Sequence, residues 1–342
     1  MSEIKLFKDI FPDYSRFENA SLILGNGASI AFNNKFSYSS LYGYACSNKF
    51  IDEKQEEIFD QLETTDFEYV LSKLQQAKII NNILDIDKKK IAINYDNIKN
   101  ALINSVKNSH AEYNEIGYFT FGNNEIFKFI HLFSNVINLN YDLILYWILN
   151  CNSENFQYAR DYFCVKNDFN TLLEFSYEYA ENKDDQVTKI FYPHGNLLFI
   201  SDNGYERKIR LTKEDRLLEE ISEKWEQGYT PLFVSEGESK QKIAAIKRSP
   251  YLNYVYESIL NDLGETIVIY GWAMGKCDKH IIDKIFKNLK IRNVVISIYN
   301  RGENNNNEII TYYEQTIRNL NRNINIQFFD SKSAGCWNNS DI

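Results

Sequence analysis

The sequence predicts an α/β protein with a mostly parallel, Rossmann-like sheet and helices on both faces. Three observations predict it. Short apolar stretches alternate with helical patterns, most apolar stretches end at a glycine or a hydrogen-bonding residue, and the first stretch runs through a glycine turn into a helix. Strands of this kind are buried on both faces, and their carboxyl ends gather functional groups at one edge of the sheet.

The first predicted strand, residues 20–24, leads into the turn Gly25–Ser29, and a helix is expected from Ala28. Such a turn gathers backbone N–H groups at a helix N-terminus, where the helix dipole also favours an anion. Glycine is expected where a side chain would hold the backbone away from the ligand. The turn therefore predicts a nucleotide site. Ile30 occupies the third glycine position of the dinucleotide fingerprint, so a turn that serves only the fold is the alternative.

Residues 35–130 are predicted to be helical, since apolar residues recur there at spacings of three and four. One predicted helix begins at Asp66, with Thr65 as its cap. We interpret residues 1–342 as a single domain, with a core of 1–34 and 131–335 and a helical insertion at 35–130.

The remaining elements alternate. Strands are predicted at 136–140, 189–192, 232–234, 266–270, 293–298 and 325–329, and a small hairpin at 196–200 and 207–211. Helices are predicted at 143–149, 213–226, 239–248, 252–263, 278–289 and 304–320.

Composition narrows the class of protein. A net charge of −9 without a Lys/Arg-rich run argues against nucleic-acid binding as the main activity. The five cysteines form no Cys-x-x-Cys pair, so neither a zinc ribbon nor a disulfide framework is expected, and no metal site is predicted. No apolar run approaches the ~20 residues of a membrane helix, and the charged N-terminus lacks a signal-peptide core. We expect a cytoplasmic protein that is not bound to a membrane.

Polar residues follow several predicted strands directly. Because parallel strands end at one edge, these groups are expected to lie together. After the Gly25–Ser29 turn they are Asn140 to Asp142, His194 and Gly195, Ser235 to Gly237, Gly271 and Trp272, and Tyr299 and Asn300.

At these residues the chain resembles the sirtuins, whose motifs occur in the same order. It is more similar to sirtuin-like proteins of bacterial anti-phage defence that cleave NAD. The stretches 65–68, 233–237 and 249–252 look like a bacterial sirtuin-like family of formerly unknown function. The motifs span about 21–300, which is most of the chain.

The resemblance implies roles for individual residues. The turn (Gly25, Asn26, Gly27, Ala28 and Ser29) would hold the NAD pyrophosphate. Asn140 and Asp142 would face the nicotinamide ribose and its carboxamide. His194, followed by Gly195, would be the general base. Gly271, with Trp272, would contact phosphate or ribose, and Asn300 would contact the adenosine ribose.

The chain also departs from sirtuins. Asn26 replaces a small residue, and the Pro-Asp-Phe-Arg segment and the four zinc cysteines are missing. Without the zinc module an acyl-lysine peptide has no obvious groove, so hydrolysis of NAD is expected in place of deacylation. The residue types suit that reaction, because an amide orients water without titrating and a histidine accepts a proton near neutral pH.

Simpler roles compete with these. Asn140 is a candidate cap for the next helix, and Glu68 a solvated charge. His131 is expected to pack within a helix, and His110 and His280 to be surface or capping groups. Lys240, Lys242, Lys247 and Arg248 are interpreted as a solvated helix face.

The predicted function is therefore an NAD glycohydrolase that releases nicotinamide and ADP-ribose, with NAD as substrate and no metal. The resemblance implies a defence effector that is inactive until triggered, as a homo-oligomer or with a partner such as an ATPase. Two alternatives stay open: a module that binds NAD or ADP-ribose without turnover, and an ADP-ribosyltransferase.

Overall fold

A computed structural model describes most of the chain. The described residues are 3–11, 17–33, 41–65, 67–87, 89–109, 125–150, 158–164, 172–181, 186–202, 204–210, 216–234, 239–299 and 302–339.

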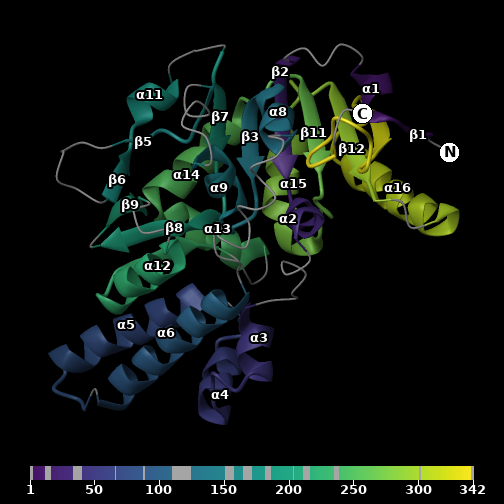
Figure 1. Ribbon diagram of the computed structural model, residues 1–342. Coiled ribbons are helices and arrows are strands. Elements are labelled where there is room, and N and C mark those ends of the chain that lie inside the picture. The colour runs from purple at the N-terminus through teal and green to yellow at the C-terminus, as the bar shows by residue number, and fades with distance from the viewer. Residues whose placement is uncertain are drawn as a thin grey trace.

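The main sheet has eight strands, and all the recorded strand pairs are parallel (Figure 1). In order across the sheet they are β1 (Ile4–Lys5), β13 (Asn325–Asp330), β12 (Asn293–Ile298), β11 (Thr266–Tyr270), β2 (Phe17–Leu24), β3 (Phe133–Asn138), β7 (Thr188–Phe191) and β4 (Ala159–Arg160). The predicted mostly parallel α/β fold is confirmed.

The six inner strands have the order found in dinucleotide-binding sheets. Across the sheet they run β7-β3-β2-β11-β12-β13, which is 3-2-1-4-5-6 when they are numbered along the chain. The chain direction across the sheet therefore reverses between β2 and β11. In this class of fold, ligands bind beyond the strand carboxyl ends at that reversal. Leu24 pairs with Tyr270 on one side and with Asn138 on the other, so these strands end at the same level.

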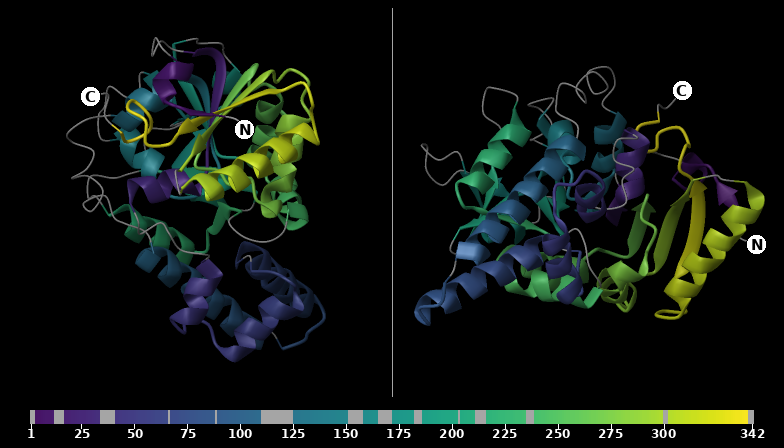
Figure 2. Two further views of the ribbon diagram at one scale, coloured as in Figure 1. Left: turned by 90° about the vertical axis from the view of Figure 1, so that its right-hand side faces the viewer. Right: turned by 90° about the horizontal axis from the view of Figure 1, so that it is seen from below.

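Helices cover both sides of the sheet (Figure 2). Those that connect or precede the inner strands are α2 (Asn26–Phe32), α8 (Glu125–His131), α9 (Ile144–Asn150), α13 (Ser239–Arg248), α14 (Pro250–Glu257), α15 (Lys279–Phe286) and α16 (Glu303–Arg318). The shorter helical elements of this part of the chain are the 3-10 helices η2 (Ile259–Asn261) and η3 (Lys276–Asp278) and the four-residue helix α1 (Phe7–Ile10). Central strand residues such as Leu22 and Val268 are fully buried, as expected between two helical layers.

A second, antiparallel sheet lies beside the first. It runs β10 (Thr230–Phe233), β8 (Gly195–Asp202), β9 (Tyr205–Ile209), β6 (Leu172–Phe175) and β5 (Phe163–Cys164), with α11 (Tyr177–Glu181) and α12 (Leu217–Glu226) nearby. The predicted hairpin is β8–β9. The strand predicted at 232–234 is β10, which belongs to this second sheet and pairs antiparallel with β8, so that its last residues meet Gly195 and His194 just beyond the end of β7.

Between α2 and α8, the described residues form four helices: α3 (Leu41–Ser47), α4 (Glu53–Gln61), α5 (Phe67–Ile83) and α6 (Lys89–Ser109). They form a body below the carboxyl ends of the main strands, with α5 and α6 side by side (Figure 1). Gln241 of α13 donates to the Glu63 carbonyl at 2.9 Å, which ties this body to the core. Phe129 of α8 packs instead against Phe7 and Phe133, so the predicted boundary at residue 131 falls within a helix of the core.

Candidate functional site

The glycine turn lies at the reversal between β2 and β11. Gly25 caps α2, which begins at Asn26, two residues before the predicted start. The Gly25 N–H donates to the Tyr270 carbonyl at 3.0 Å, and the Gly27 N–H donates to the Gly271 carbonyl at 2.8 Å. The turn is therefore bonded directly to the residues that follow β11.

The close approach of these two backbones explains the glycines. A Cβ on Gly25 would lie 2.5 Å from the Trp272 Cα, and one on Gly27 would lie 2.7 Å from the Gly271 Cα. Gly271 has φ +69, and its Cβ would lie 2.3 Å from the Ala28 nitrogen. We expected these glycines to leave room for a ligand. That reason is wrong at these positions, because protein backbone fills the space.

Asn140 joins the turn through its side chain. Its amide Nδ2 donates to the Gly25 carbonyl and to the Ser29 Oγ, both at 3.0 Å. Because both acceptors require an N–H, the orientation of the amide is fixed, and Oδ1 is the atom left to accept a hydrogen bond from a water or a ribose hydroxyl. Asn140 is only partly buried.

Asp142 completes this cluster. It is 5% exposed, and it accepts hydrogen bonds from the Ser29 hydroxyl and, at 3.0 Å, from the Ile144 N–H. Asp142 therefore caps α9, a role considered for Asn140. Burial raises the pKa of Asp142, and the bonds from Ser29 and Ile144 oppose that rise.

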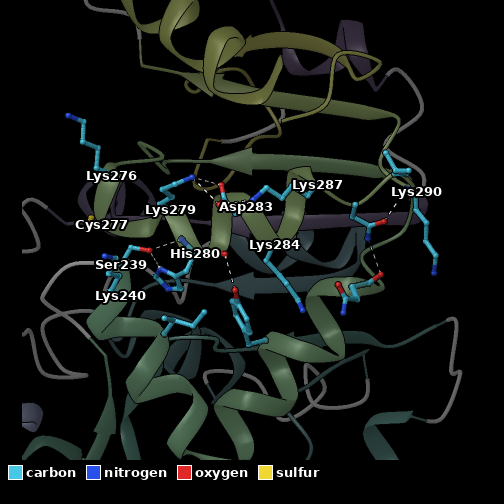
Figure 3. A pocket seen from close by; sticks show the side chains of 15 residues that line it. Ser239, Lys240, Lys276, Cys277, Lys279, His280, Asp283, Lys284, Lys287 and Lys290 are labelled. Carbon is cyan, nitrogen blue, oxygen red and sulfur yellow. Dashed lines mark hydrogen bonds and ion pairs between the residues drawn. The ribbon is translucent and has the colours of Figure 1, made fainter. Parts of the chain in front are cut away.

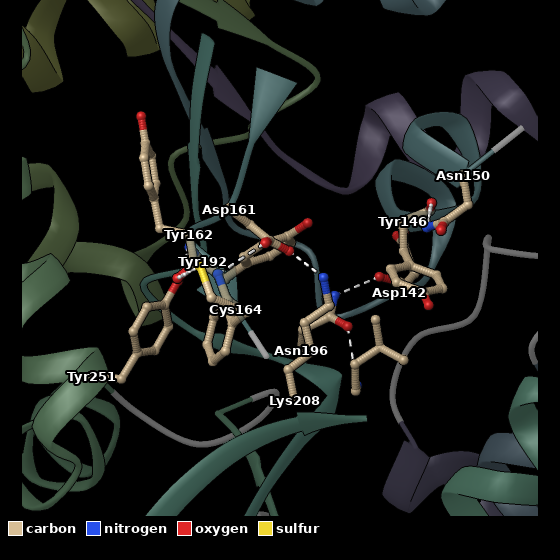
Figure 4. Close-up of polar contacts among 12 residues, drawn as sticks. Asp142, Tyr146, Asn150, Asp161, Tyr162, Cys164, Tyr192, Asn196, Lys208 and Tyr251 are labelled. Carbon is tan, nitrogen blue, oxygen red and sulfur yellow. Dashed lines mark hydrogen bonds and ion pairs between the residues drawn. The ribbon is translucent and has the colours of Figure 1, made fainter. Parts of the chain in front are cut away.

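The second sheet contacts the same cluster (Figure 4). Asn196 of β8 donates to the Asp142 carbonyl at 2.6 Å. Deeper in the sheet, the buried Lys208 of β9 pairs with Asp161, and its ammonium lies 4.8 Å from the centre of the Tyr146 ring on α9. The antiparallel sheet thus supports α9 and the carboxylate at its start.

His194 lies in the turn between β7 and β8. Gly195 makes this turn, with φ +73 and a position where a Cβ would lie 2.2 Å from the Leu232 carbonyl oxygen. The His194 side chain is 3% exposed. One ring nitrogen bonds to the backbone of Leu139, next to Asn140, and Nε2 lies 3.0 Å from His280 Nε2. The predicted amide and imidazole therefore lie beside neighbouring strand ends.

The hydrogen-bond partners of His194 and His280 determine which ring nitrogen of each neutral imidazole carries the proton. A carbonyl only accepts, so the His194 nitrogen that faces Leu139 carries a proton and Nε2 accepts from His280. His280 Nδ1 then accepts from Ser239 Oγ at 3.2 Å, while that oxygen accepts from the His280 N–H at 2.9 Å. A single chain of hydrogen bonds thus runs from Ser239 through His280 and His194 to Leu139.

Both histidines are held neutral. Burial lowers the pKa of His194, and the Lys242 cation lowers it further. Burial lowers the pKa of His280 to about 4, against the opposing effect of Asp278. His280 was expected at the surface or as a cap. That prediction is wrong, because its side chain is 5% exposed and contacts a residue far away in the sequence.

A buried ion pair lies next to the histidines. Lys242 of α13 is 3.1 Å from Asp278 of η3, and the Trp272 indole N–H donates to the same carboxylate at 2.9 Å. Burial alone would raise the pKa of Asp278, but the Lys242 cation and the hydrogen bonds from Lys242 and Trp272 lower it. Lys242 was interpreted as part of a solvated helix face, and that is wrong. The sequence carries no signal for this pair beyond an acid and a base in separate elements.

The other predicted residues have mixed positions. Asn26 is exposed, Ala28 is fully buried, and Trp272 is 4% exposed beside the turn. His131 ends α8 and lies 3.4 Å from the Thr188 hydroxyl. Asn300, His110, Asp66 and 235–237 lie outside the described residues, as does the side chain of Glu68.

Residues 331–339 also hold the turn, and the sequence did not indicate this. The Trp337 indole donates to the Ala28 carbonyl at 3.0 Å, and the Asn338 amide donates to the Ala31 carbonyl at 3.0 Å. Trp337 is nearly fully buried. The segment after the last strand therefore holds α2 through two of its backbone carbonyls.

Two kinds of feature are absent from the described ranges. No group of three or more His, Cys, Asp or Glu side chains is placed to hold a metal ion. No helix within the described part of the chain has the length and apolar character needed to cross a membrane.

Fold and site together define an α/β protein of the dinucleotide-binding strand order, with polar side chains at the reversal. The sequence matches the family described as "Domain of unknown function (DUF4917)" over residues 22–337. The chain therefore belongs to that family, and the match runs from β2 through Trp337. A search of curated proteins finds no match.

Proposed function

We propose that this chain hydrolyses NAD to nicotinamide and ADP-ribose at the carboxyl edge of β2, β3 and β7. One observation carries the proposal: the glycine turn lies where the strand order reverses, and the Asn140 amide bonds to that turn. The resemblance to NAD-cleaving sirtuin-like proteins assigns the same residues to the dinucleotide.

The chemistry needs few groups. The bond between ribose C1′ and the nicotinamide nitrogen breaks, and its electron pair leaves with nicotinamide. A water oxygen bonds to C1′ and gives up a proton. In this proposal Asn140 Oδ1 orients the water or a ribose hydroxyl, the Asp142 carboxyl lies near the developing positive charge, and His194 Nε2 takes the proton.

The contact between the histidines has a consequence for regulation. His194 Nε2 accepts a hydrogen bond from His280, so its lone pair is engaged. A base needs that lone pair free, so this contact must open before His194 acts. We propose it as the basis of the inactive state expected for a defence effector, with an oligomer or a partner such as an ATPase supplying the trigger.

Nicotinamide release tests the proposal. Wild type and His194→Ala are incubated with NAD, alone and with candidate partners, and nicotinamide is quantified by chromatography. We expect release by wild type under at least one condition, and a loss of about 100-fold or more in the variant, as for removal of a general base. His131→Ala is the control, because that histidine lies at the end of α8. Equal release by wild type and His194→Ala would contradict the assignment.

A binding module without turnover is the second candidate. The observation that favours it is that His194 is buried and its Nε2 is engaged with His280, which leaves no free lone pair to take a proton. Such a module would bind ADP-ribose in calorimetry and release no nicotinamide under any condition. An ADP-ribosyltransferase would instead mark a protein or nucleic acid with label from NAD.

A further inference from the structure

A groove along α15 differs in charge from the rest of the molecule. It has a volume of about 1200 Å³ and lies between α15 with the segment after it and the parts of α13, α14 and η2 that face it (Figure 3). Among the residues that the structure describes, its lining contains a single carboxylate, that of Asp283, and six lysines: Lys240, Lys276, Lys279, Lys284, Lys287 and Lys290. The whole chain has a net charge of −9, so this concentration of cations is local.

The cations of the groove are only partly balanced. Asp283 pairs with both Lys279, at 2.8 Å, and Lys287, at 2.9 Å, so one carboxylate serves two ammonium groups. Although partial burial opposes it, these two lysines lower the pKa of Asp283. Lys240 and Lys276 are exposed, and neither has an ion pair with a carboxylate among the described residues.

The groove also offers neutral polar groups. Asn261 and Asn288 line it, and each keeps an amide hydrogen beyond the one that it donates to a backbone carbonyl, whereas the Ser239 hydroxyl and the His280 ring N–H are already engaged. Lysines attract phosphate as mobile point charges, while amide groups fix the orientation of a ligand. The volume exceeds that of typical small-molecule pockets, which suits an extended ligand with several charges.

We propose that this lysine groove binds a soluble oligophosphate, either inorganic or at the end of a nucleotide. The ligand is expected to be short, because carboxylates lie along one border of the lysine groove. Glu257 pairs with Lys284 and Asp262 with Lys290, so negative charge borders the groove on the side of α14 and η2. A long nucleic acid would extend beyond the lysines over a surface of net negative charge, which opposes its binding.

This site is separate from the one proposed for NAD hydrolysis. None of the residues that line the groove belongs to the glycine turn, and neither Asn140 nor His194 lines it. His280 is the residue nearest to both, since it lines the groove and its Nε2 contacts His194. Oligophosphate binding therefore stands or fails independently of any NAD hydrolysis.

Calorimetric titration of sodium tripolyphosphate into the full chain, with EDTA present, tests the proposal. We expect one ligand per chain and an affinity that weakens as salt is raised, because exposed charges are screened. The variant Lys240→Gln/Lys276→Gln should bind at least about tenfold more weakly, since it loses two charged contacts. The matched control Lys224→Gln/Lys247→Gln removes the same charge outside the groove and should bind as wild type does.

Further arms identify the source of the phosphate and complete the test. ATP binding as tightly as tripolyphosphate, with AMP much weaker, would indicate a nucleotide end, whereas weak ATP binding would indicate the inorganic ion. Thermal unfolding checks that both double variants are folded. Absence of tripolyphosphate binding, equal affinity in wild type and the groove variant, or displacement of tripolyphosphate by a tighter oligothymidylate would each overturn the proposal.

Discussion

Two neighbouring regions of the carboxyl edge are built in different ways. The turn region, formed by Gly25–Ser29, Asn140, Asp142 and Gly271, is held by backbone carbonyls, N–H groups and short polar side chains. The histidine region, formed by His194, His280, Lys242 and Asp278, is held by ionisable side chains from separate elements. Trp272 belongs to both, since its backbone abuts Gly25 and its indole binds Asp278.

The difference bears on which region is able to change. The turn region depends on the close steric fit of two backbone segments, and such packing allows a single arrangement of these segments. The histidine region depends on charge states and on which nitrogen carries a proton, and both respond to pH or to a bound charge. Under the proposed function, the turn region would position the dinucleotide, and the histidine region would control activity.

The largest expected effect comes from separating the buried ion pair. Lys242→Met leaves Asp278 buried without its cation, which should lower the free energy of unfolding by about 3–5 kcal/mol. Lys247→Met, on the exposed face of the same helix, should change it by less than about 0.5 kcal/mol. Urea denaturation measures both. Adding Asp278→Asn to Lys242→Met should restore part of the loss, because the uncompensated charge is removed. Equal stability of Lys242→Met and Lys247→Met would show that the ion pair contributes nothing.

The turn region should respond to added volume. In Gly271→Ala the new Cβ meets the Ala28 nitrogen and the residue keeps a positive φ, so we expect a loss of about 3 kcal/mol in unfolding free energy. Gly228 also has positive φ, +101, but nothing lies within 4 Å of its Cβ position. Gly228→Ala should therefore lose only about 1 kcal/mol, from backbone strain alone. Similar losses in the two variants would show that the close approach is unimportant.

The histidine region predicts a pH dependence of stability. Folded His280 has its pKa lowered to about 4 from 6.5, so between these values the unfolded chain binds a proton that the folded chain does not. Stability is therefore complete above pH 6.5 and falls as pH drops toward 4, by at most about 1.4 kcal/mol per pH unit for each such histidine. Asp278, whose pKa is lowered, adds its own loss only at more acidic pH.

The variant His280→Gln separates the histidines. Glutamine keeps a donor for His194 but does not titrate, so the loss of stability between pH 6.5 and 4 should become shallower than in wild type. Unfolding free energies measured by urea at several pH values give the two slopes. Identical slopes would mean that His280 is not held neutral in the folded chain.

The smallest expected effect is at Ser29. Its hydroxyl accepts from Asn140 and donates to Asp142, so Ser29→Ala leaves a buried carboxylate one donor short. We expect a loss of about 1–2 kcal/mol in unfolding free energy. The pKa of Asp142, followed by NMR, should rise further in the variant, because Ser29 opposes the effect of burial. An unchanged pKa would contradict the assigned contact.

Local patterns in the sequence predicted most of the main sheet. The strands at 266–270 and 293–298 have the predicted bounds, since continuous apolar runs in a two-faced core are a local signal. The pairing of strands is not local. The stretch 232–234 has the composition of a core strand, but Gly195 lets its backbone approach β8, and it joins the second sheet. The two-residue strand β5 is too short to show any period.

The candidate site divides in the same way. The sequence predicted Gly25–Ser29, Asn140 and His194 as site residues, because each follows a predicted strand and the ends of parallel strands lie at one edge of the sheet. His280 and Lys242 lie on amphipathic helices, where a polar residue is usually solvated. Only the packing of α13 and α15 against the turn at His194 buries them, and one sequence contains no sign of that contact.

NAD binding by wild type and Asn26→Asp tests whether the glycine turn holds the dinucleotide. Asn26 is exposed at the first position of α2, where a carboxylate favours the helix dipole but repels a pyrophosphate. We predict that wild type binds NAD in calorimetry, and that Asn26→Asp loses that binding while its thermal stability is unchanged or higher. Asn323→Asp, the same change at a distant exposed site, should bind as wild type does. Absence of NAD binding by wild type, or equal binding by Asn26→Asp, would contradict the account.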